Sequence, residues 1–181
     1  MAVALNATVY GFEIELSDVD RGVYATFALR AARHPSETAE YLLTRVLAYC
    51  LEYAEGLEMS RGLAEPDEPA LVLRDLTGAL QAWIEVGAPD AARLHKASKA
   101  APRVAVYTHK DPGLLVRQIA GERIHRVEEL EIHSVDRALL AELAARLERR
   151  MKLGVTVTDR NLYVTIGDAT LSGTVERHPV G

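Results

Sequence analysis

The alternation of apolar and polar residues over positions 9–33 predicts a long β-hairpin near the start of the chain. Apolar side chains recur at every second position through Leu16, and the polar segment 18–22 supplies the turn. Both arms of this hairpin are long. We therefore expect it to wrap the domain rather than to form a detachable arm.

A helical pattern follows the hairpin. Pro35 ends the strand, and Ser36 can cap the free N–H groups of a helix that continues to about residue 54. Glu37 and Glu40 fall in the predicted first turn, where the helix dipole favours anions. The expected buried stripe consists of Leu42, Leu43, Val46, Leu47, Cys50 and Leu51. The segment 56–69 is predicted to be a loop.

Short periodic segments alternate in type through the rest of the chain. We expect strands at 70–75, 79–86, 103–108 and 127–133, and helices at 90–100, 111–119 and 136–150. The tail from residue 153 is expected to form two or three strands that turn at 159–160 and 167–168. With no internal repeat and no second domain, this order predicts a single compact α+β domain over residues 1–181, in which a mixed β-sheet has flanking helices.

Composition narrows the class of protein. The chain is 49% hydrophobic and 26% charged, which is ordinary for a globular protein. The single cysteine, Cys50, excludes an internal disulfide, and its apolar helical setting indicates buried packing. No apolar run is long enough to span a membrane, and the N-terminus lacks the basic region of a signal peptide. We therefore expect a cytoplasmic protein without a membrane partner.

The formal net charge of -5 argues against a generic nucleic-acid binder, but the charge is unevenly distributed. Residues 1–92 carry a net charge of -9, residues 93–126 carry +6, and residues 127–181 carry -2. This order suits a metal site beside a phosphate-binding surface, although a solvated helix face and a basic loop would give the same asymmetry. If the first interpretation holds, the expected nucleic-acid contacts are Arg93, Lys99, Arg103, Lys110, Arg117 and Arg123.

The register of the hairpin over residues 70–86 brings particular carboxylates together. If Thr77 and Gly78 form a two-residue loop, paired positions sum to about 155, so that Glu85 faces Ala70. Acidic residues just before strand entry can then reach Glu85, whereas Asp75 lies about 15 Å away near the turn.

Glu85 is the residue whose position most needs a reason. It occupies a strand flanked by apolar residues, where a carboxylate is costly unless it is paired. One interpretation is a metal ligand with nearby glutamates, aspartates and Lys96. The other is a glutamate at the sheet edge that forms a salt bridge with an arginine in a purely structural or interaction domain. The histidines show no zinc-ligand spacing.

Several blocks of the sequence are distinctive, namely HPSET, DEPALVLRDLTG, WIEVGAPD, the KA of HKASKA, and VAVYTH. Together they resemble the YaeQ family of bacterial proteins. The resemblance covers nearly the whole chain. That family is similar in fold to the PD-(D/E)XK nuclease superfamily, whose core runs helix, antiparallel strands, helix, strand. The resemblance implies such a nuclease-like core, with the N-terminal hairpin and the C-terminal strands added to it.

Two positions depart from the nuclease motif that the resemblance implies. Ala70 stands where the motif has aspartate, and Gly87, two residues after Glu85, stands where it has lysine. Migration of the lysine to the following helix is a known variation within the superfamily. The substitute for the lysine would then be Lys96, and the substitute for the aspartate would be Asp67 or Glu68.

The resemblance thus implies a Mg²⁺- or Mn²⁺-dependent phosphodiester hydrolase with a degenerate site. Its catalytic residues would be Glu37 (or Glu40), Glu85 and Lys96, and its metal ligands would be Glu85, Asp67 and Glu37. The alternative is a non-catalytic accessory protein that binds nucleic acid or a protein partner through the same surface.

Overall fold

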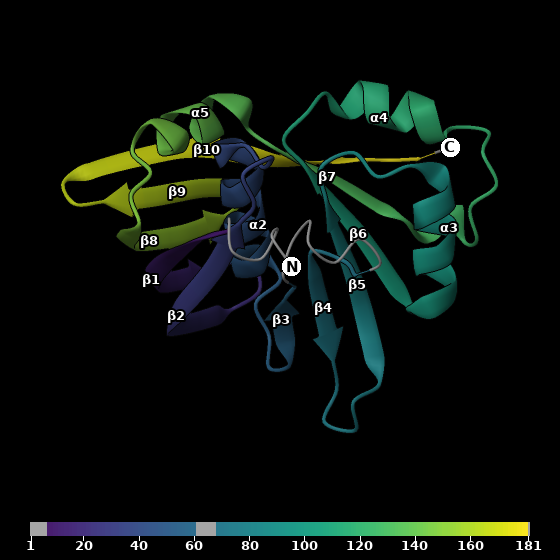
Figure 1. The fold of residues 1–181 in the computed structure, drawn as a ribbon, viewed down its shortest axis with the longest axis horizontal. Helices are drawn as coiled ribbons and strands as arrows, with labels where there is room; N and C mark the ends of the chain where they lie inside the picture. The colour runs from purple at the N-terminus through teal and green to yellow at the C-terminus, as the bar shows by residue number, and fades with distance from the viewer. Residues whose placement is uncertain (1–6, 61–67, 181) are drawn as a thin grey trace.

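The structure is a computed structural model that describes residues 7–60 and 68–180. Within these ranges, one ten-stranded mixed sheet and four α-helices form an α+β domain (Figure 1). The strands are β1 (Thr8–Asp18), β2 (Val23–Arg33), β3 (Leu57–Met59), β4 (Leu71–Arg74), β5 (Leu80–Val86), β6 (Arg103–Thr108), β7 (Glu131–Val135), β8 (Arg150–Thr158), β9 (Asn161–Ile166) and β10 (Ala169–His178). The helices are α2 (Ala39–Leu51), α3 (Ala91–Ala100), α4 (Pro112–Ile119) and α5 (Arg137–Ala145).

The sheet has two arms that share one strand. Its order is β2-β1-β8-β9-β10-β7-β6-β5-β4-β3. The first half of β10 pairs with β9, and its last four residues pair with β7. We call β2, β1, β8 and β9 the first arm, and β7, β6, β5, β4 and β3 the second arm. In Figure 1, β10 crosses from one arm to the other in yellow.

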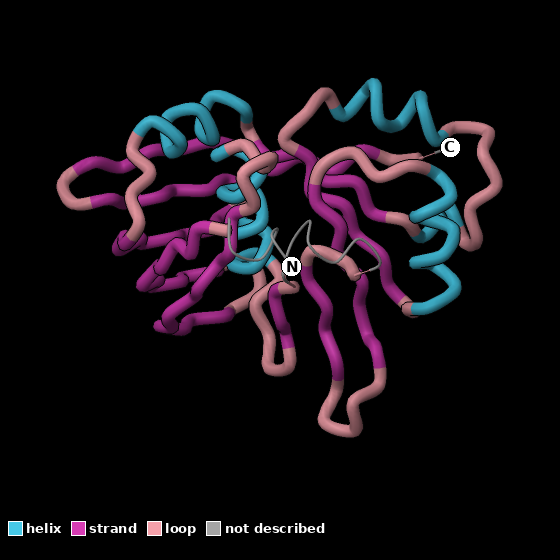
Figure 2. Tube along the Cα trace, in the orientation of Figure 1, coloured by secondary structure: helices cyan, strands magenta, loops and turns pink. Residues whose placement is uncertain are grey.

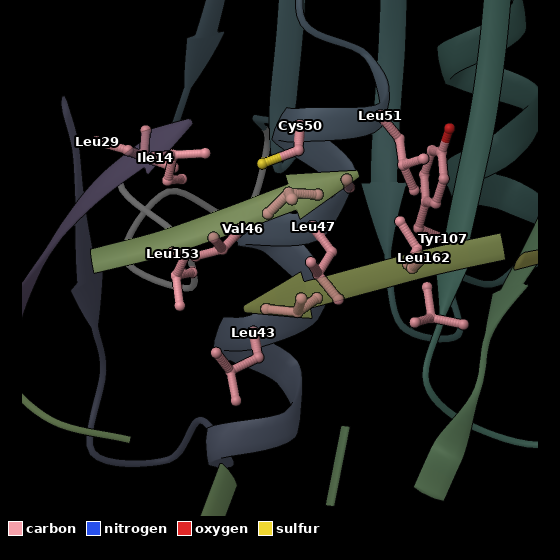
Figure 3. Close-up of a cluster of buried hydrophobic side chains, with 14 of the residues drawn as sticks. Ile14, Leu29, Leu43, Val46, Leu47, Cys50, Leu51, Tyr107, Leu153 and Leu162 are labelled. Carbon is pink, nitrogen blue, oxygen red and sulfur yellow. The ribbon is translucent and has the colours of Figure 1, made fainter. Parts of the chain in front are cut away.

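Helix α2 lies between the two arms and is buried nearly all round. Its apolar side chains pack against inward-facing residues of the first arm, such as Ile14 and Leu153, and against Tyr107 of the second arm (Figure 3). A second apolar cluster lies on the opposite face of the second arm, where α3 and α4 cover Trp83, Val104 and Val106. Burial on both faces explains why β6 carries a continuous apolar run.

The sequence pattern predicted the hairpin register well. Leu71 pairs with Ile84 and Val72 pairs with Trp83, so the paired positions sum to 155 as expected. A bulge after Leu73 then shifts the register, and Arg74 pairs with Leu80 rather than with Gln81. The hairpin projects beyond the neighbouring strands (Figure 2).

Several predicted boundaries were wrong, each for a local reason. Helix α2 begins after Thr38, whose Oγ1 accepts the N–H of Tyr41 at 3.0 Å, so Glu37 precedes the helix and is not in its first turn. Ser36 Oγ instead contacts His34 Nδ1 at 2.7 Å. The predicted strand at 127–133 begins as a 3-10 turn (Val127–Glu129), and the strand itself is β7.

The remaining elements agree in type with the sequence analysis. Helix α5 stops at Ala145, five residues earlier than predicted, because the chain must turn to enter β8 at Arg150. The tail forms three strands with turns at 159–160 and 167–168. The predicted loop 56–69 contains the short strand β3. In the described parts of the chain, no helix is both long and apolar enough to cross a membrane.

Candidate functional site

A cavity of about 410 Å³ opens where the carboxyl ends of β5 and β6 meet the amino-terminal end of α2. Carboxyl ends of parallel strands are a frequent place for ligand sites in sheets that carry helices. We call this the β5–β6 cavity. Its polar and motif-position lining residues are Ser36, Glu37, Thr38, Tyr41, Ser60, Glu68, Ala70, Glu85, Gly87, Arg93, His109 and Lys110.

Glu85 is buried in the wall of this cavity, with 4% of its surface exposed. Its Oε2 accepts a hydrogen bond from Trp83 Nε1 at 2.9 Å and a second one from Arg93 Nε. Arg93 comes from the first turn of α3, which Asp90 caps by accepting the N–H of Arg93 at 2.8 Å. Arg93 Nη2 also donates to the carbonyl of Glu68 at 2.7 Å. The arginine therefore fixes one oxygen of the Glu85 carboxylate.

Glu37 is anchored in the same manner. Its Oε2 accepts a hydrogen bond at 3.0 Å from Nη2 of Arg45, and both side chains are fully buried. The same Nη2 donates to the carbonyl of Ala32 at 2.6 Å. Within the described residues, Oε1 of Glu37 and both Nε and Nη1 of Arg45 are buried without a hydrogen-bond partner. Buried polar atoms of this kind are uncommon, because each costs about 1–3 kcal/mol.

Tyr41 and His109 meet in the wall of the same cavity. The His109 ring approaches the Tyr41 ring edge-on, with the ring centres 5.8 Å apart. Burial raises the pKa of Tyr41 against the opposing charge of Arg45, and the negative charges of Glu37 and Glu85 raise it further. Burial also lowers the pKa of His109, with a contribution from the adjacent Lys110. His109 is therefore neutral near pH 7, and its Nδ1 is a further buried atom without a partner among the described residues.

Both altered motif positions lie in the cavity wall. Gly87 adopts a left-handed backbone with a φ of 98°, and a Cβ there would lie 3.3 Å from Cε2 of Tyr41. Any L-residue at Gly87 would therefore be strained. Ala70 is buried and donates no functional group to the cavity.

The other residues that the sequence analysis associated with the metal site are distributed as follows. Asp67 lies outside the described residues. Lys96 is exposed on α3, and the lysine in the cavity wall is Lys110. Glu40 lies in the first turn of α2. Asp75 lies apart at the tip of the β4–β5 hairpin, where its Oδ1 accepts the backbone N–H groups that close the turn, as the register predicts.

The six predicted nucleic-acid contacts do not form one surface. Arg93 and Lys110 line the β5–β6 cavity. Desolvation lowers the pKa of His95, and the positive charges of Lys99 and Arg123 nearby lower it further. Arg117 is exposed on α4.

Arg103 lies in a separate ion-pair network at the opposite, carboxyl end of α2. Its guanidinium contacts both oxygens of Glu52, at 2.6 and 2.9 Å, and both oxygens of Glu131, at 2.8 and 3.0 Å. The Tyr107 hydroxyl donates to Glu52, and His133 Nε2 lies 3.0 Å from Glu131. We call these five residues the Arg103 network.

A complete metal site is not preformed in the described part of the chain. Within residues 7–60 and 68–180, no three His, Cys, Asp or Glu side chains come together as a potential metal-ligand set. The β5–β6 cavity instead offers two anchored glutamates and the backbone around Glu68. Any metal bound there needs further ligands.

The comparisons with known proteins extend over the whole fold. The family model described as YaeQ protein matches residues 3–175. The chain belongs to the YaeQ family. YaeQ of Escherichia coli strain K12 is 34% identical over 165 residues, which covers 90% of this chain and 91% of that protein. YaeQ of Salmonella typhi is 33% identical over 164 residues, with the same coverage.

Solved YaeQ structures share the fold. The crystal structure of YaeQ from Pseudomonas syringae has a TM-score of 0.87 at 32% identity and covers 97% of both chains. YaeQ from Xanthomonas axonopodis pv. citri has a TM-score of 0.86 at 32% identity, covering 97% of this chain and 99% of the other. The resemblance inferred from the sequence blocks is thereby confirmed at the level of the YaeQ family.

Some residues of the site were missed from the sequence. Arg45 is the only charged side chain between residues 41 and 51, in a helix that is otherwise apolar on nearly every side. Such a helix is predicted to be buried, and a buried arginine requires a buried acid. This signal could have identified the pair of Arg45 with Glu37. His109 carried no comparable signal.

Proposed function

We propose that the β5–β6 cavity binds a phosphodiester together with a divalent cation and that the protein hydrolyses the bond. The elements around the cavity support this proposal, because α2, the strands β3 to β5, α3 and β6 follow the order of a PD-(D/E)XK core. The four positions equivalent to its motif, Glu37, Ala70, Glu85 and Gly87, all line the one cavity.

The observation that carries the proposal is the way the two glutamates are held. Each carboxylate has its Oε2 fixed by an arginine, Arg45 for Glu37 and Arg93 for Glu85. The hydrogen bonds from described residues leave Oε1 of each glutamate unused. A carboxylate that is oriented through one oxygen and unpaired at the other is the arrangement expected of a metal ligand with supporting outer contacts. Oε1 of Glu37 is buried, so an ion must displace the groups that cover it to reach this oxygen.

The donor set fits Mg²⁺ or Mn²⁺. Mg²⁺ prefers oxygen ligands, keeps several waters, and is often held by only one or two carboxylates plus substrate phosphates. Glu37 and Glu85 would be the protein ligands, with Asp67 or Glu68 completing the set. Such an ion polarises the phosphate and lowers the pKa of a bound water. Because two carboxylates bind the ion weakly, we expect the metal and the phosphodiester to bind cooperatively.

Cationic side chains in the cavity would contact the phosphate. Lys110 is exposed in the cavity wall and forms no ion pair among the described residues, so its ammonium can approach a non-bridging oxygen. We assign to Lys110 the role of the missing motif lysine. The sequence analysis predicted Lys96 for that role, and this prediction stays open as the alternative to Lys110. Arg103 is left out of the proposed contacts, since its guanidinium is engaged by Glu52 and Glu131.

A cleavage assay tests the proposal. Labelled single-stranded and duplex oligonucleotides are incubated with the protein in Mg²⁺, Mn²⁺ or chelator. We expect metal-dependent cleavage that Glu85→Gln and Glu37→Gln abolish, with Lys110→Gln reducing the rate by about a hundredfold. Glu58→Gln, an exposed substitution on β3, is the matched control and should retain the activity. Cleavage that is unchanged in Glu85→Gln would show that hydrolysis occurs elsewhere.

One observation favours a second function, which is binding without hydrolysis. Gly87 has a left-handed backbone, so a lysine at this motif position would be strained. In addition, the charge of Glu85 is already neutralised by its ion pair with Arg93. Under this alternative, oligonucleotide binding is salt-dependent, survives Glu85→Gln, and is weakened by Lys110→Gln, with no cleavage under either metal. The absence of both cleavage and binding at low salt would refute both nucleic-acid functions.

A further inference from the structure

The outward face of the first arm carries a second cavity that is unrelated to the β5–β6 cavity. It has a volume of about 730 Å³ and lies over β2, β1 and β8. The outward side chains of these strands are exposed or half-buried, whereas the corresponding face of the second arm is covered by α3 and α4. Four basic residues line the cavity, namely Arg30, Arg149, Arg150 and Lys152, with Glu13 as the acid among its lining residues.

The strand register places two of these arginines on either side of a glycine. Gly11 of β1 pairs with Arg30 of β2 and, on its other side, with Arg150 of β8. Gly11, Arg30 and Arg150 therefore form one row across the sheet, with the arginine Cα atoms about 10 Å apart. Because the central residue has no side chain, this row is a slot with a backbone floor at Gly11 and an arginine on each side.

The guanidinium groups of the slot are not committed to other contacts. Within the described residues, neither Arg30 nor Arg150 forms an ion pair. Arg149, which lines the same cavity, is engaged elsewhere, because its Nε donates to the carbonyl of Val9 at 3.3 Å and its guanidinium lies 6.0 Å from the centre of the Tyr10 ring. In the next row, Lys152 Nζ lies 3.8 Å from Glu13 Oε2 in an exposed ion pair. Glu13 is thus paired with Lys152, and the row of Gly11 itself holds two positive charges and no acidic residue.

From this geometry, we infer that the slot over Gly11 is a phosphate-binding site. A tetrahedral oxyanion on the glycine floor can accept hydrogen bonds from Arg30 and Arg150 at once, and guanidinium groups bind phosphate with two parallel bonds each. The phosphate can come from a small phosphorylated ligand or from a nucleic-acid backbone. The site lies on the other arm from the β5–β6 cavity and does not depend on hydrolysis there.

The charge distribution along the sequence concealed this site. Arg30 lies in the segment of net charge -9, and Arg149, Arg150 and Lys152 lie in the segment of net charge -2. Only the parallel pairing of β1 with β8, between residues about 140 positions apart in the chain, brings them together.

An NMR titration of the ¹⁵N-labelled protein with pyrophosphate tests the site, and a thymidine 20-mer is the second probe. We expect shifts at Gly11, Arg30 and Arg150 with pyrophosphate at low salt. Neutralising either arginine, as Arg30→Gln or Arg150→Gln, should weaken binding about three- to tenfold. Arg74→Gln, which removes an exposed arginine from the other arm, should leave the affinity unchanged.

Gly11→Val tests the slot without changing its charge. A Cβ at Gly11 would meet only the carbonyl of Arg149 at 3.9 Å, and the backbone there has no positive φ, so the variant should fold. We expect it to weaken pyrophosphate binding as much as loss of one arginine does. Full affinity in Gly11→Val would overturn the slot geometry.

The two probes distinguish the sources of the phosphate. If the 20-mer shifts the slot signals, with or without an effect of pyrophosphate, the slot binds a nucleic-acid backbone. If only pyrophosphate shifts them, the slot binds a small phosphorylated ligand. Lys110→Gln should not alter either result, so failure of the cleavage proposal would leave this one intact. If neither probe shifts Gly11, Arg30 or Arg150 at low salt, the inference is wrong.

Discussion

The two ends of helix α2 use the same residue types in different ways. At its carboxyl end, the Arg103 network pairs all four carboxylate oxygens of Glu52 and Glu131 with one guanidinium. At its amino end, Glu37 and Glu85 are each held through a single oxygen. The first arrangement is closed, because no carboxylate oxygen remains for a ligand. The second is open.

This difference separates a structural ion-pair network from a candidate site. A fully satisfied buried network rigidifies a core, whereas unsatisfied buried atoms lower stability unless they have another use. The unpartnered atoms at the amino end of α2 belong to Glu37, Arg45 and His109. All three residues lie in or directly behind the wall of the β5–β6 cavity. The free-energy cost of burying these unpartnered atoms is explained if the cavity binds a ligand that forms hydrogen bonds with them.

Breaking the closed network should have the largest effect on stability. Arg103→Met leaves the carboxylates of Glu52 and Glu131 without their cation. Loss of one partner of a buried ion pair costs up to about 5 kcal/mol, and we expect about 2–4 kcal/mol here because the Arg103 side chain is 38% exposed. Urea denaturation measures this loss. Arg74→Met is the matched control, and a loss in Arg103→Met no greater than in the control would show that the network is not structural.

A lysine at Gly87, where the proposed nuclease motif would have one, should destabilise the protein and should not increase cleavage. Gly87→Lys places an L-residue at a φ of 98° and a Cβ 3.3 Å from Tyr41, so we expect a loss of about 1–3 kcal/mol and no gain in cleavage. Gly121→Lys shares the positive φ but meets nothing within 4 Å, so it should cost less. Thermal unfolding of the two variants gives the comparison. Equal losses would show that the contact with Tyr41 is unimportant.

The closed network should also set part of the acid sensitivity. Hydrogen bonds from His133 and Arg103, with the Arg103 charge, lower the pKa of Glu131 well below its usual range despite the opposing effect of burial. A lowered pKa contributes stability above the unfolded-state pKa of about 4.3, and this contribution is lost as the pH falls toward the folded-state pKa. Glu131→Gln should therefore be less stable than wild type near pH 7, by about 1–3 kcal/mol.

The difference between wild type and Glu131→Gln should stay constant above about pH 5 and narrow as the pH is lowered from about 5 to about 2. Urea midpoints at each pH give the curve. A difference that stays constant with pH would mean that the charge of Glu131 contributes nothing to the network.

The sequence predicted those parts of the fold that depend on local pattern. The run 103–108 was assigned to its strand without error, and the pairing of Leu71 with Ile84 followed from the turn residues. The boundaries of α2 and α5 were less accurate, because caps and chain reversals depend on single side-chain contacts such as that of Thr38. The parallel pairing of β1 with β8 left no local signal.

The candidate site was predictable only in part. Glu37, Ala70, Glu85 and Gly87 line one cavity, and the catalytic and metal-binding roles that the sequence analysis gave to Glu37 and Glu85 stay predictions. The role of Arg103 depends on pairings over long separations, so it could not be read from the charge pattern, whereas Arg45 and Arg93 each pair with a glutamate eight positions away. Arg103 joins Glu52 across 51 positions, whereas Arg93 turns back to Glu85 from the next helix.

Paramagnetic broadening by Mn²⁺ tests most directly whether the open end of α2 is the site. Substoichiometric Mn²⁺ is added to the ¹⁵N-labelled protein with and without a phosphodiester dinucleotide. We expect the amide signals of Gly87, Glu37 and His109 to broaden first, more strongly with the dinucleotide, and to remain sharp in Glu85→Gln. The signals of Arg103 and Glu131 should be unaffected. Broadening at Arg103 and Glu131 first, or no selective broadening at Gly87 with the dinucleotide present, would contradict the assignment of the β5–β6 cavity as a metal and phosphodiester site.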